Sequence, residues 1–143
     1  MNPAFTIRPA TETDSPAIAA LVRSAKLPVD GIEHARFTVA DHAGRIVGCA
    51  GLEVYGGSGL LRSVAVDPEW RGRGVGDALV RAVLDGAAQD KVDPVVLLTD
   101  TAPAWFPRFG FEVTTRENVP SALHASAEFK GACPDTATVM RIR

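Results

Sequence analysis

Residues 64–76 read VAVDPEWRGRGVG, an apolar run of strand character followed by a loop with glycine at every second position. Beyond the loop, apolar residues recur at helical spacing, which predicts an amphipathic helix of about four turns. Gly72, Gly74 and Gly76 leave the mouth of this helix free of side chains. Backbone N–H groups there have no helical acceptor, and the helix dipole adds partial positive charge. We therefore predict that residues 71–76 form a loop that suits a pyrophosphate.

Two familiar phosphate-binding patterns are excluded by their spacing. A dinucleotide fingerprint needs glycine where Asp77 stands, and a Walker A loop needs a Lys-Ser or Lys-Thr pair that this segment lacks. The alternative interpretation is a glycine-rich turn that merely begins a helix.

The remaining patterns place this strand, loop and helix in one mixed sheet. A helix is expected to begin at Ser15, as its cap, with Pro16 as the first helical residue. Residues 29–35 have no clear period and suit a short helix or a substrate-covering loop equally well. The predicted fold class is α/β, a single mixed central sheet flanked by helices. Strands are expected at residues 5–8, 37–40, 45–55, 60–66, 95–98, 111–115 and 137–142, and short helices at residues 102–109 and 120–127.

Composition restricts the class of protein. The chain has 143 residues, 46% hydrophobic and 22% charged, which we interpret as one domain over residues 1–143. Such a chain buries about 68% of its unfolded surface. It shows neither a membrane-length apolar run nor a signal-peptide start, so we expect a cytoplasmic protein that does not span a membrane. The net charge of −2 gives no basic footprint for a nucleic acid.

The two cysteines, Cys49 and Cys133, lie far apart in the sequence. Neither has a second cysteine or a histidine at a zinc-ligand spacing, so we predict reduced thiols and no metal site.

With these residues in view, the chain resembles the GNAT-type N-acetyltransferases, which carry Arg/Gln-x-x-Gly-x-Gly/Ala after a strand. Residues 102–111, which end in Gly110-Phe111, match the second signature of that family, so the resemblance covers nearly the whole chain. It implies the GNAT-like acyl-CoA N-acyltransferase fold and acetyl-CoA as co-substrate. The implied cofactor-binding residues are Arg71, Gly72, Arg73, Gly74, Val75 and Gly76 for the pyrophosphate, Val64, Ala65 and Val66 for the pantetheine arm, and Thr99 and Phe106.

The sequence departs from the family at the position of the catalytic acid. Relatives commonly place a tyrosine four residues before the signature glycine, where Phe106 stands here, and Thr99 replaces a frequent asparagine. Phenylalanine cannot donate a proton. This departure leaves three interpretations. Another group serves as the acid, the CoA thiolate leaves without protonation, or the domain has lost its catalytic activity.

Acetyl transfer to an amine needs a base more than an acid, because an alkyl amine has a pKa of about 10.4 and a thiol about 8.5. Strand parity puts Glu53 and Tyr55 on the same face, so we predict Glu53 as a base acting through water and Tyr55 as a replacement acid. The alternatives are an exposed glutamate near a strand end and an aromatic residue beside a turn. By parity, Cys49 shares the face of Glu53 and Tyr55, while Ile46, Ala50, Leu52 and Val54 share the other.

Arg62 lies inside an otherwise apolar strand, where a charge seldom occurs without a partner. It either pairs with an internal carboxylate or binds an anionic group of the substrate. Ser63 is expected to point the opposite way.

The last third of the chain supports a narrower resemblance. Residues 126–129, Ser-Ala-Glu-Phe, with Cys133-Pro134 and residues 51–56 and 61–66, are similar to the arsenic-resistance N-acetyltransferases and to glutamate-acetylating enzymes. The resemblance implies a small acceptor amine, anionic or arsenical among the options. It implies that Arg62 and Glu128 lie near the acceptor site, and Ser63 is a further candidate for substrate binding.

We therefore predict an enzyme that moves the acetyl group of acetyl-CoA to the primary amine of a small molecule by direct attack in a ternary complex. The alternative from another class is a non-catalytic acyl-CoA sensor, which Phe106 favours. A protein-acetylating enzyme and a covalent route through Cys49 are weaker options. Residues 137–142 could form a homodimer by adding to a partner's sheet, or an edge strand within the chain.

Overall fold

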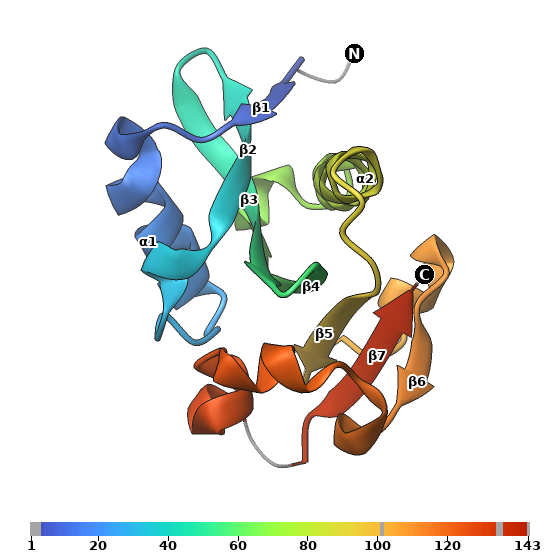
Figure 1. Cartoon of the computed structure of the whole chain (residues 1–143). Coiled ribbons are helices and arrows are strands. Elements are labelled where there is room, and N and C mark those ends of the chain that lie inside the picture. The colour runs from blue at the N-terminus through green and yellow to red at the C-terminus, as the bar shows by residue number, and fades with distance from the viewer. Residues whose placement is uncertain (1–3, 101, 134–135, 143) are drawn as a thin grey trace.

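The fold is described by a computed structural model that covers residues 4–100, 102–133 and 136–142. Within these ranges the strands form one seven-stranded sheet in the order β1-β2-β3-β4-β5-β7-β6 (Figure 1). Neighbouring strands are antiparallel except β4 and β5, which are parallel. The predicted single mixed sheet is confirmed. The strands are β1 (Thr6–Pro9), β2 (Arg36–His42), β3 (Arg45–Tyr55), β4 (Ser58–Val66), β5 (Val95–Thr99), β6 (Glu112–Thr114) and β7 (Thr138–Ile142).

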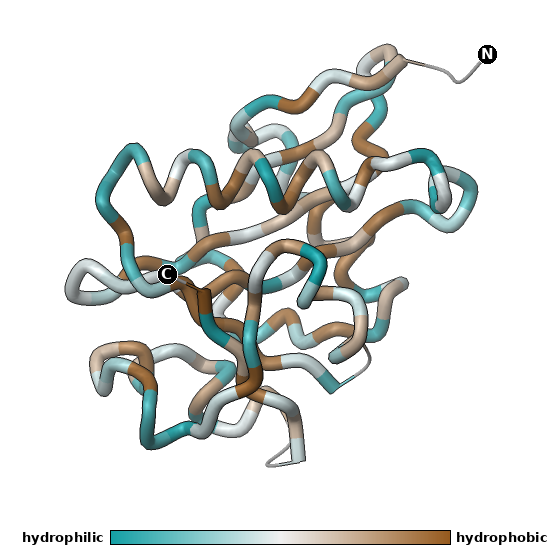
Figure 2. The backbone as a smooth tube through the Cα atoms, turned by 90° about the vertical axis from the view of Figure 1, so that its right-hand side faces the viewer, coloured by the Kyte–Doolittle hydropathy of each residue, from teal (hydrophilic) through white to brown (hydrophobic). Residues whose placement is uncertain are grey.

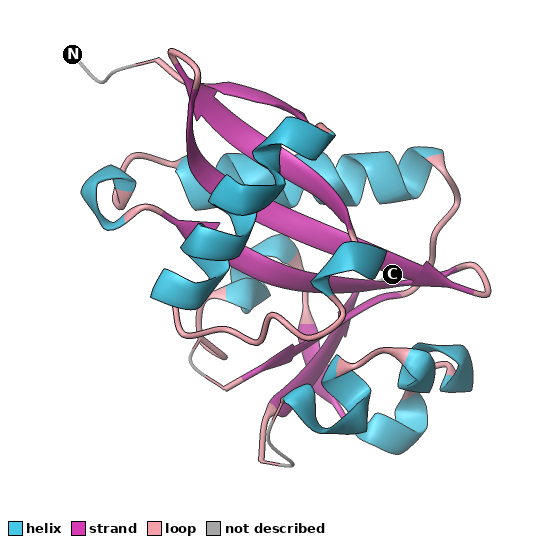
Figure 3. Cartoon of the chain, turned by 90° about the vertical axis from the view of Figure 1, so that its left-hand side faces the viewer, coloured by secondary structure: helices cyan, strands magenta, loops and turns pink. Residues whose placement is uncertain are grey.

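Two α-helices cover opposite faces of the sheet. The helix α1 (Ser15–Ser24) lies across one face and α2 (Val75–Gln89) lies behind it on the other (Figure 3). Short helical turns connect the other elements, and the predicted helix at residues 102–109 is reduced to η4. These turns are η1 (Glu12–Asp14), η2 (Ile32–His34), η3 (Pro68–Trp70), η4 (Phe106–Phe109), η5 (Arg116–Asn118), η6 (Ser121–Ala125) and η7 (Glu128–Ala132).

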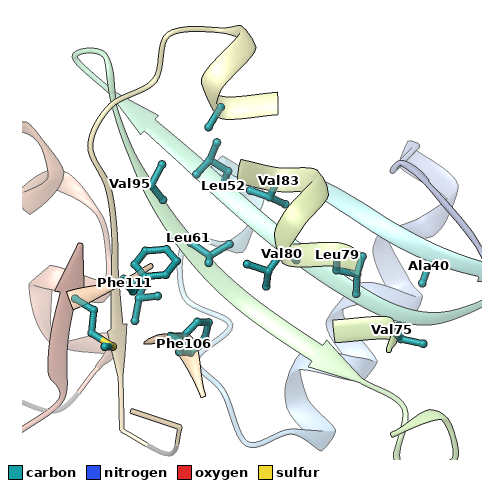
Figure 4. Close-up of a cluster of buried hydrophobic side chains, with 14 of the residues drawn as sticks. Ala40, Leu52, Leu61, Val75, Leu79, Val80, Val83, Val95, Phe106 and Phe111 are labelled. Atoms are coloured by element: carbon teal, nitrogen blue, oxygen red, sulfur yellow. The ribbon is translucent and has the colours of Figure 1, made fainter. Parts of the chain in front are cut away.

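The core under α2 holds the phosphate-loop helix in place. Apolar and polar residues alternate along α2 (Figure 2), so that one stripe of the helix is buried. Val75, Leu79 and Val83 pack on Leu52 and other residues of the sheet (Figure 4). Among the described helices, none is long and apolar enough to cross a membrane.

Several local predictions need correction. Ser15 is the first helical residue and Asp14 takes the N-cap position. Ile46 does not share the face of Ala50, although strand parity predicted that it would. It packs in the apolar cluster that contains α1, whereas Val47 and Ala50 pack in the cluster that contains α2. The reason is that the β2–β3 register shifts between Ala40 and Asp41. A bulge of this kind adds one residue to a strand and reverses the alternation of faces beyond it.

The last strand is not at an edge. Residues of β7 pair with β5 on one side and with β6 on the other. Both hydrogen-bonding edges of β7 are therefore occupied within the chain, so this strand cannot extend a partner's sheet. The idea of a homodimer stays a prediction, without the route through residues 137–142.

The strands β4 and β5 separate soon after they meet. They pair only at Gly59 with Val95 and at Leu60 with Val96. Farther along, β4 carries a bulge, because Cys49 faces Ala65 while Gly51 faces Arg62. Ser63 within this bulge has a φ of 57°, a conformation that a residue with a side chain seldom adopts. The bulged end of β4 and the end of β5 thus diverge and leave a wedge between them.

The close contact of β3 with α2 can be tested at Gly48. A Cβ atom there would lie 2.8 Å from Val75 Cγ1 and 2.9 Å from Leu79 Cδ1. We expect Gly48→Ala to lower the free energy of unfolding by about 1–3 kcal/mol in urea denaturation. The control is Gly86→Ala within α2, where a Cβ meets nothing within 4 Å. It should raise this free energy by about 0.5–1 kcal/mol. Equal losses in the two variants would contradict this packing.

Candidate active site

A cleft of about 1020 Å³ occupies the wedge between β4 and β5. Its walls come from the diverging ends of the two strands and from the loop that precedes α2. The cleft is also lined by residues 25–28, after α1, and by Glu128, Ala132 and Cys133 in and after η7, and Pro28 and Glu128 lie beside Arg62. The cleft therefore joins the predicted phosphate loop to the predicted acceptor residues.

The phosphate loop has the backbone geometry that its glycines suggested. Gly72 and Gly74 have φ angles of 78° and 82°, in the left-handed region that favours glycine. The first helical bond of α2 runs from the Ala78 N–H to the Gly74 carbonyl, 3.0 Å. The N–H groups of Val75, Gly76 and Asp77 thus precede the helical ladder, and no side chain caps them. A Cβ at Gly72 or Gly74 would meet nothing within 4 Å, so the loop has an open surface that fits a pyrophosphate.

Arginines flank the loop without filling it. The guanidinium of Arg73 lies over the Trp70 ring at 5.0 Å, and that of Arg108 lies over the Trp105 ring at 5.2 Å. Of the predicted cofactor-binding residues, all except Arg73 line the cleft.

Phe106 places an aromatic ring at the position where the resemblance implies a tyrosine. Phe106 lines the cleft and packs edge-on against Trp105 and Phe111, with ring centroids 4.9 and 6.0 Å away. Thr99, at the end of β5, accepts a hydrogen bond from the Ala102 N–H at 3.0 Å. This hydroxyl therefore holds the turn that leads toward η4.

Arg62 is the centre of a buried charged cluster. Its side chain has no exposed surface, and its Nη1 donates to Glu53 Oε2 at 2.9 Å. Its Nε lies 3.4 Å from Glu128 Oε2 and 3.0 Å from Ser63 Oγ. Two backbone carbonyls, of Pro28 and Asp30, accept from its remaining N–H groups at 3.0 and 2.8 Å. Of the two interpretations of Arg62, the pairing with internal carboxylates is what the structure contains.

Ser63 lies on the same side as Arg62, so the expectation that it points the opposite way is wrong. The reason is the β4 bulge, which breaks the alternation between Arg62 and Ser63.

Glu53 is buried behind Arg62. Its Oε2 accepts from Arg62 and from Ser126 Oγ at 3.1 Å, and its Oε1 accepts from the Tyr55 hydroxyl at 2.5 Å. Neither Glu53 nor Tyr55 belongs to the residues that line the cleft. Burial and the nearby Glu53 carboxylate raise the pKa of Tyr55 to about 12. The roles of this pair as base and acid stay predictions.

Glu128, by contrast, lines the cleft. Burial of its carboxyl group raises its pKa to about 7, with Arg62 opposing the shift and Glu53 adding to it. The Cys133 thiol, which also lines the cleft, forms a hydrogen bond with this carboxylate. Burial raises the pKa of Cys133 and of Cys49 to about 12, so neither is poised as a thiolate. Within the described ranges, no cluster of side chains suits a metal ion.

Sequence reasoning missed some residues of the site. Ser126 links the Glu53 carboxylate to the backbone of Glu128, because its hydroxyl donates to Glu53 Oε2 and accepts from the Glu128 N–H at 3.2 Å. Lys26, with a φ of 60° after α1, also lines the cleft. The Ser-x-Glu spacing of residues 126–128 was a local signal for Ser126, but no sequence pattern indicated that Lys26 belongs to the site.

Sequence comparisons identify similar proteins. A family model described as an acetyltransferase (GNAT) domain matches residues 33–113. An amino-acid acetyltransferase from Pasteurella multocida is 31% identical over 133 residues, which cover 84% of this chain and 30% of that protein. Another, from Pseudomonas syringae pv. tomato, is 34% identical over 100 residues, covering 68% and 23% respectively. The chain thus spans less than a third of the length of these curated relatives.

Solved structures share the fold. N-acetylglutamate synthase from Neisseria gonorrhoeae, complexed with coenzyme A and N-acetyl-glutamate, has a TM-score of 0.82 at 22% identity. That likeness covers 100% of this chain and 36% of that chain. Rv2747 from Mycobacterium tuberculosis, in complex with CoA and a second ligand, has a TM-score of 0.77 at 26% identity, covering 96% and 98%. The predicted acyl-CoA N-acyltransferase fold is confirmed.

Proposed function

The chain belongs to the acetyltransferase (GNAT) domain family, and on this premise we propose that it transfers the acetyl group of acetyl-CoA to the amine of a small amino acid or amino-acid-like molecule. The observation that carries the proposal is the single cleft that runs from the phosphate loop to the charged cluster around Arg62. The amino-acid acetyltransferases among its relatives support the choice of acceptor.

The cofactor end of the cleft is built from backbone groups. We propose that the N–H groups at the start of α2 bind the pyrophosphate of acetyl-CoA. Among the residues that the structure describes, no strand pairs with β4 between Leu61 and Val66 on the β5 side. The backbone groups on that edge are suited to hydrogen bonds with a pantetheine arm, and an N–H beside Val66 to stabilising an oxyanion.

The acceptor end offers charges of both signs. Glu128 provides a carboxylate for an ammonium group, and Lys26 provides a cation for a substrate carboxylate. Arg62 lines the cleft, but its side chain is fully buried and engaged with protein groups, so in this arrangement it supports Glu128 by pairing with it. An amine that also carries a carboxylate is therefore the acceptor that matches these residues.

When bound, acetyl-CoA supplies the thioester carbonyl carbon that the acceptor nitrogen attacks. The residues of the chain orient the two reactants in one cleft, which favours direct transfer in a ternary complex. The buried thiol of Cys49 lies outside the residues that line the cleft, which weighs against a covalent acetyl-cysteine.

The test is release of free thiol from acetyl-CoA in the presence of a panel of acceptors. The panel contains glutamate and other amino acids, their carboxamide counterparts, polyamines and amino-acid-like arsenicals. We expect acceptor-dependent release with amino acids, and a higher KM when the α-carboxylate is replaced by an amide, because Lys26 then lacks its anionic partner. Release with polyamines but not with amino acids would contradict the proposed acceptor class.

A second candidate function is a non-catalytic acyl-CoA sensor, and Phe106 is the observation that favours it. Phe106 presents only hydrocarbon where relatives carry an acid. Tight binding of acetyl-CoA without acceptor-dependent thiol release would support the sensor instead of the enzyme.

A further inference from the structure

The buried cluster contains one guanidinium for two carboxylates, and the two carboxylates are held differently. Arg62 Nη1 lies 2.9 Å from Glu53, whereas its Nε lies 3.4 Å from Glu128 and also donates to Ser63. Glu53 has three hydrogen-bond donors within 3.1 Å. Glu53 is therefore the tightly paired carboxylate, and Glu128 is the loosely paired one.

The two carboxylates also differ in what they face. Glu53 is 1% exposed and is absent from the lining of the cleft, while Glu128 is part of that lining. The groups that face Glu128 are Arg62 from β4, Glu53 from β3 and the Cys133 thiol after η7. Of the two carboxylates, Glu128 therefore borders the space open to an acceptor, and Arg62, which also lines the cleft, contacts both.

Resting on the acetyl-transfer function proposed above, we propose that Glu128 is the catalytic base that takes the proton of the acceptor amine, and that Glu53 is a positioning residue acting through Arg62. In this step the amine nitrogen forms a bond to the acetyl carbon and the carbon–sulfur bond breaks. The electron pair of that bond leaves on sulfur as the thiolate of CoA. The proton lost by nitrogen goes to a carboxylate oxygen of Glu128, directly or through one water.

The same residue accounts for the absence of a tyrosine at position 106. A carboxylic acid with a pKa of about 7 is a stronger acid than a thiol, whose ordinary pKa is about 8.5. After the transfer, the proton on Glu128 therefore passes to the thiolate by way of solvent in a favourable direction. This returns Glu128 to its basic form and needs no separate acid.

The pH dependence follows from the titration of Glu128. The base is active when deprotonated, so kcat/KM of the wild-type protein should fall as pH decreases below about 7. In Glu128→Gln we expect kcat at pH 7 to fall by about 100-fold or more. In this variant the acidic limb of the kcat/KM profile should move to higher pH, toward the pKa of the acceptor amine, because only the neutral amine can then react. That pKa is about 10.4 for an alkyl amine.

Two measurements separate this effect from a failure to fold or to bind. The Kd for acetyl-CoA should be unchanged in Glu128→Gln, because the phosphate loop is intact. The carboxyl group of Glu128 has a raised pKa in the folded state. The wild-type protein therefore loses free energy of unfolding as pH increases from about 4.5 to about 7 and this group becomes charged. A neutral glutamine removes that loss, so the Tm at pH 8 should equal or exceed that of the wild type.

The matched variant is Glu53→Gln. Because Glu53 adds to the raised pKa of Glu128, its neutralisation should move the acidic limb of kcat/KM to lower pH while the limb persists. A Glu128→Gln protein that keeps wild-type kcat and its acidic limb near pH 7, or that changes KM alone, would overturn the inference. If the wild-type protein releases no thiol with any acceptor, the proposed function itself has failed.

Discussion

Gly74→Glu should abolish measurable binding of acetyl-CoA, weakening the Kd by about 100-fold or more in calorimetric titration. Gly74 has a φ of 82°, and the position of its missing Cβ faces open space at the mouth of α2. A carboxylate there would compete for the free N–H groups of the helix and would repel a pyrophosphate. The effect therefore tests the phosphate loop directly.

The chain provides a closely matched control for this variant. Gly57 is also exposed, has a φ of 88° and would place its Cβ in open space, but it lies in the β3–β4 turn outside the cleft. Gly57→Glu introduces the same side chain with similar backbone strain, so its Kd for acetyl-CoA should match the wild type. Equal affinities in the two glutamate variants would remove the assignment of residues 71–76 to the pyrophosphate.

Arg62→Met should lower the free energy of unfolding at pH 7 by about 3–5 kcal/mol. The side chain of Arg62 is fully buried, and its removal leaves Glu53 and Glu128 buried without a compensating charge. Protonation of Glu128, whose pKa is raised to about 7 by burial, relieves the repulsion, so the loss of free energy should shrink as pH decreases toward 5. Urea denaturation at both pH values measures the effect.

An exposed ion pair serves as the control for Arg62. Arg45 donates to Asp67 at 2.7 Å, but its side chain is 61% exposed. Arg45→Met should change the free energy of unfolding by less than about 1 kcal/mol, because solvent screens such pairs. A loss below this value in Arg62→Met as well would show that the buried cluster contributes no more than a surface pair.

The parts of the molecule that sequence predicted well are those specified by local patterns. The glycine-rich loop and the apolar stripe of α2 lie within one continuous segment, residues 64–89. Their geometry depends on backbone rules that neighbouring residues are enough to apply. The strands of the sheet were recognised for the same reason, by alternation and by apolar runs.

The charged cluster could be predicted only in part, because it depends on contacts across the fold. Glu53 and Glu128 meet at Arg62 although 75 positions separate them in sequence (128 − 53). Glu128 lines the cleft and Glu53 does not, and this difference depends on the path of η7, which no periodic pattern describes. Strand parity also failed where bulges occur, at Ser63 and near Ile46, since an extra residue reverses every face beyond it.

The short pairing of β4 with β5 has a further consequence for the proposed cofactor. A sheet gains stability from its continuous ladder, yet this ladder stops after Leu60 and Val96. A pantetheine arm bound along β4 would act as an additional strand and satisfy the main-chain groups that the wedge leaves without a neighbour. The co-substrate would then be a structural component of the sheet, and the free energy of unfolding would increase with its concentration.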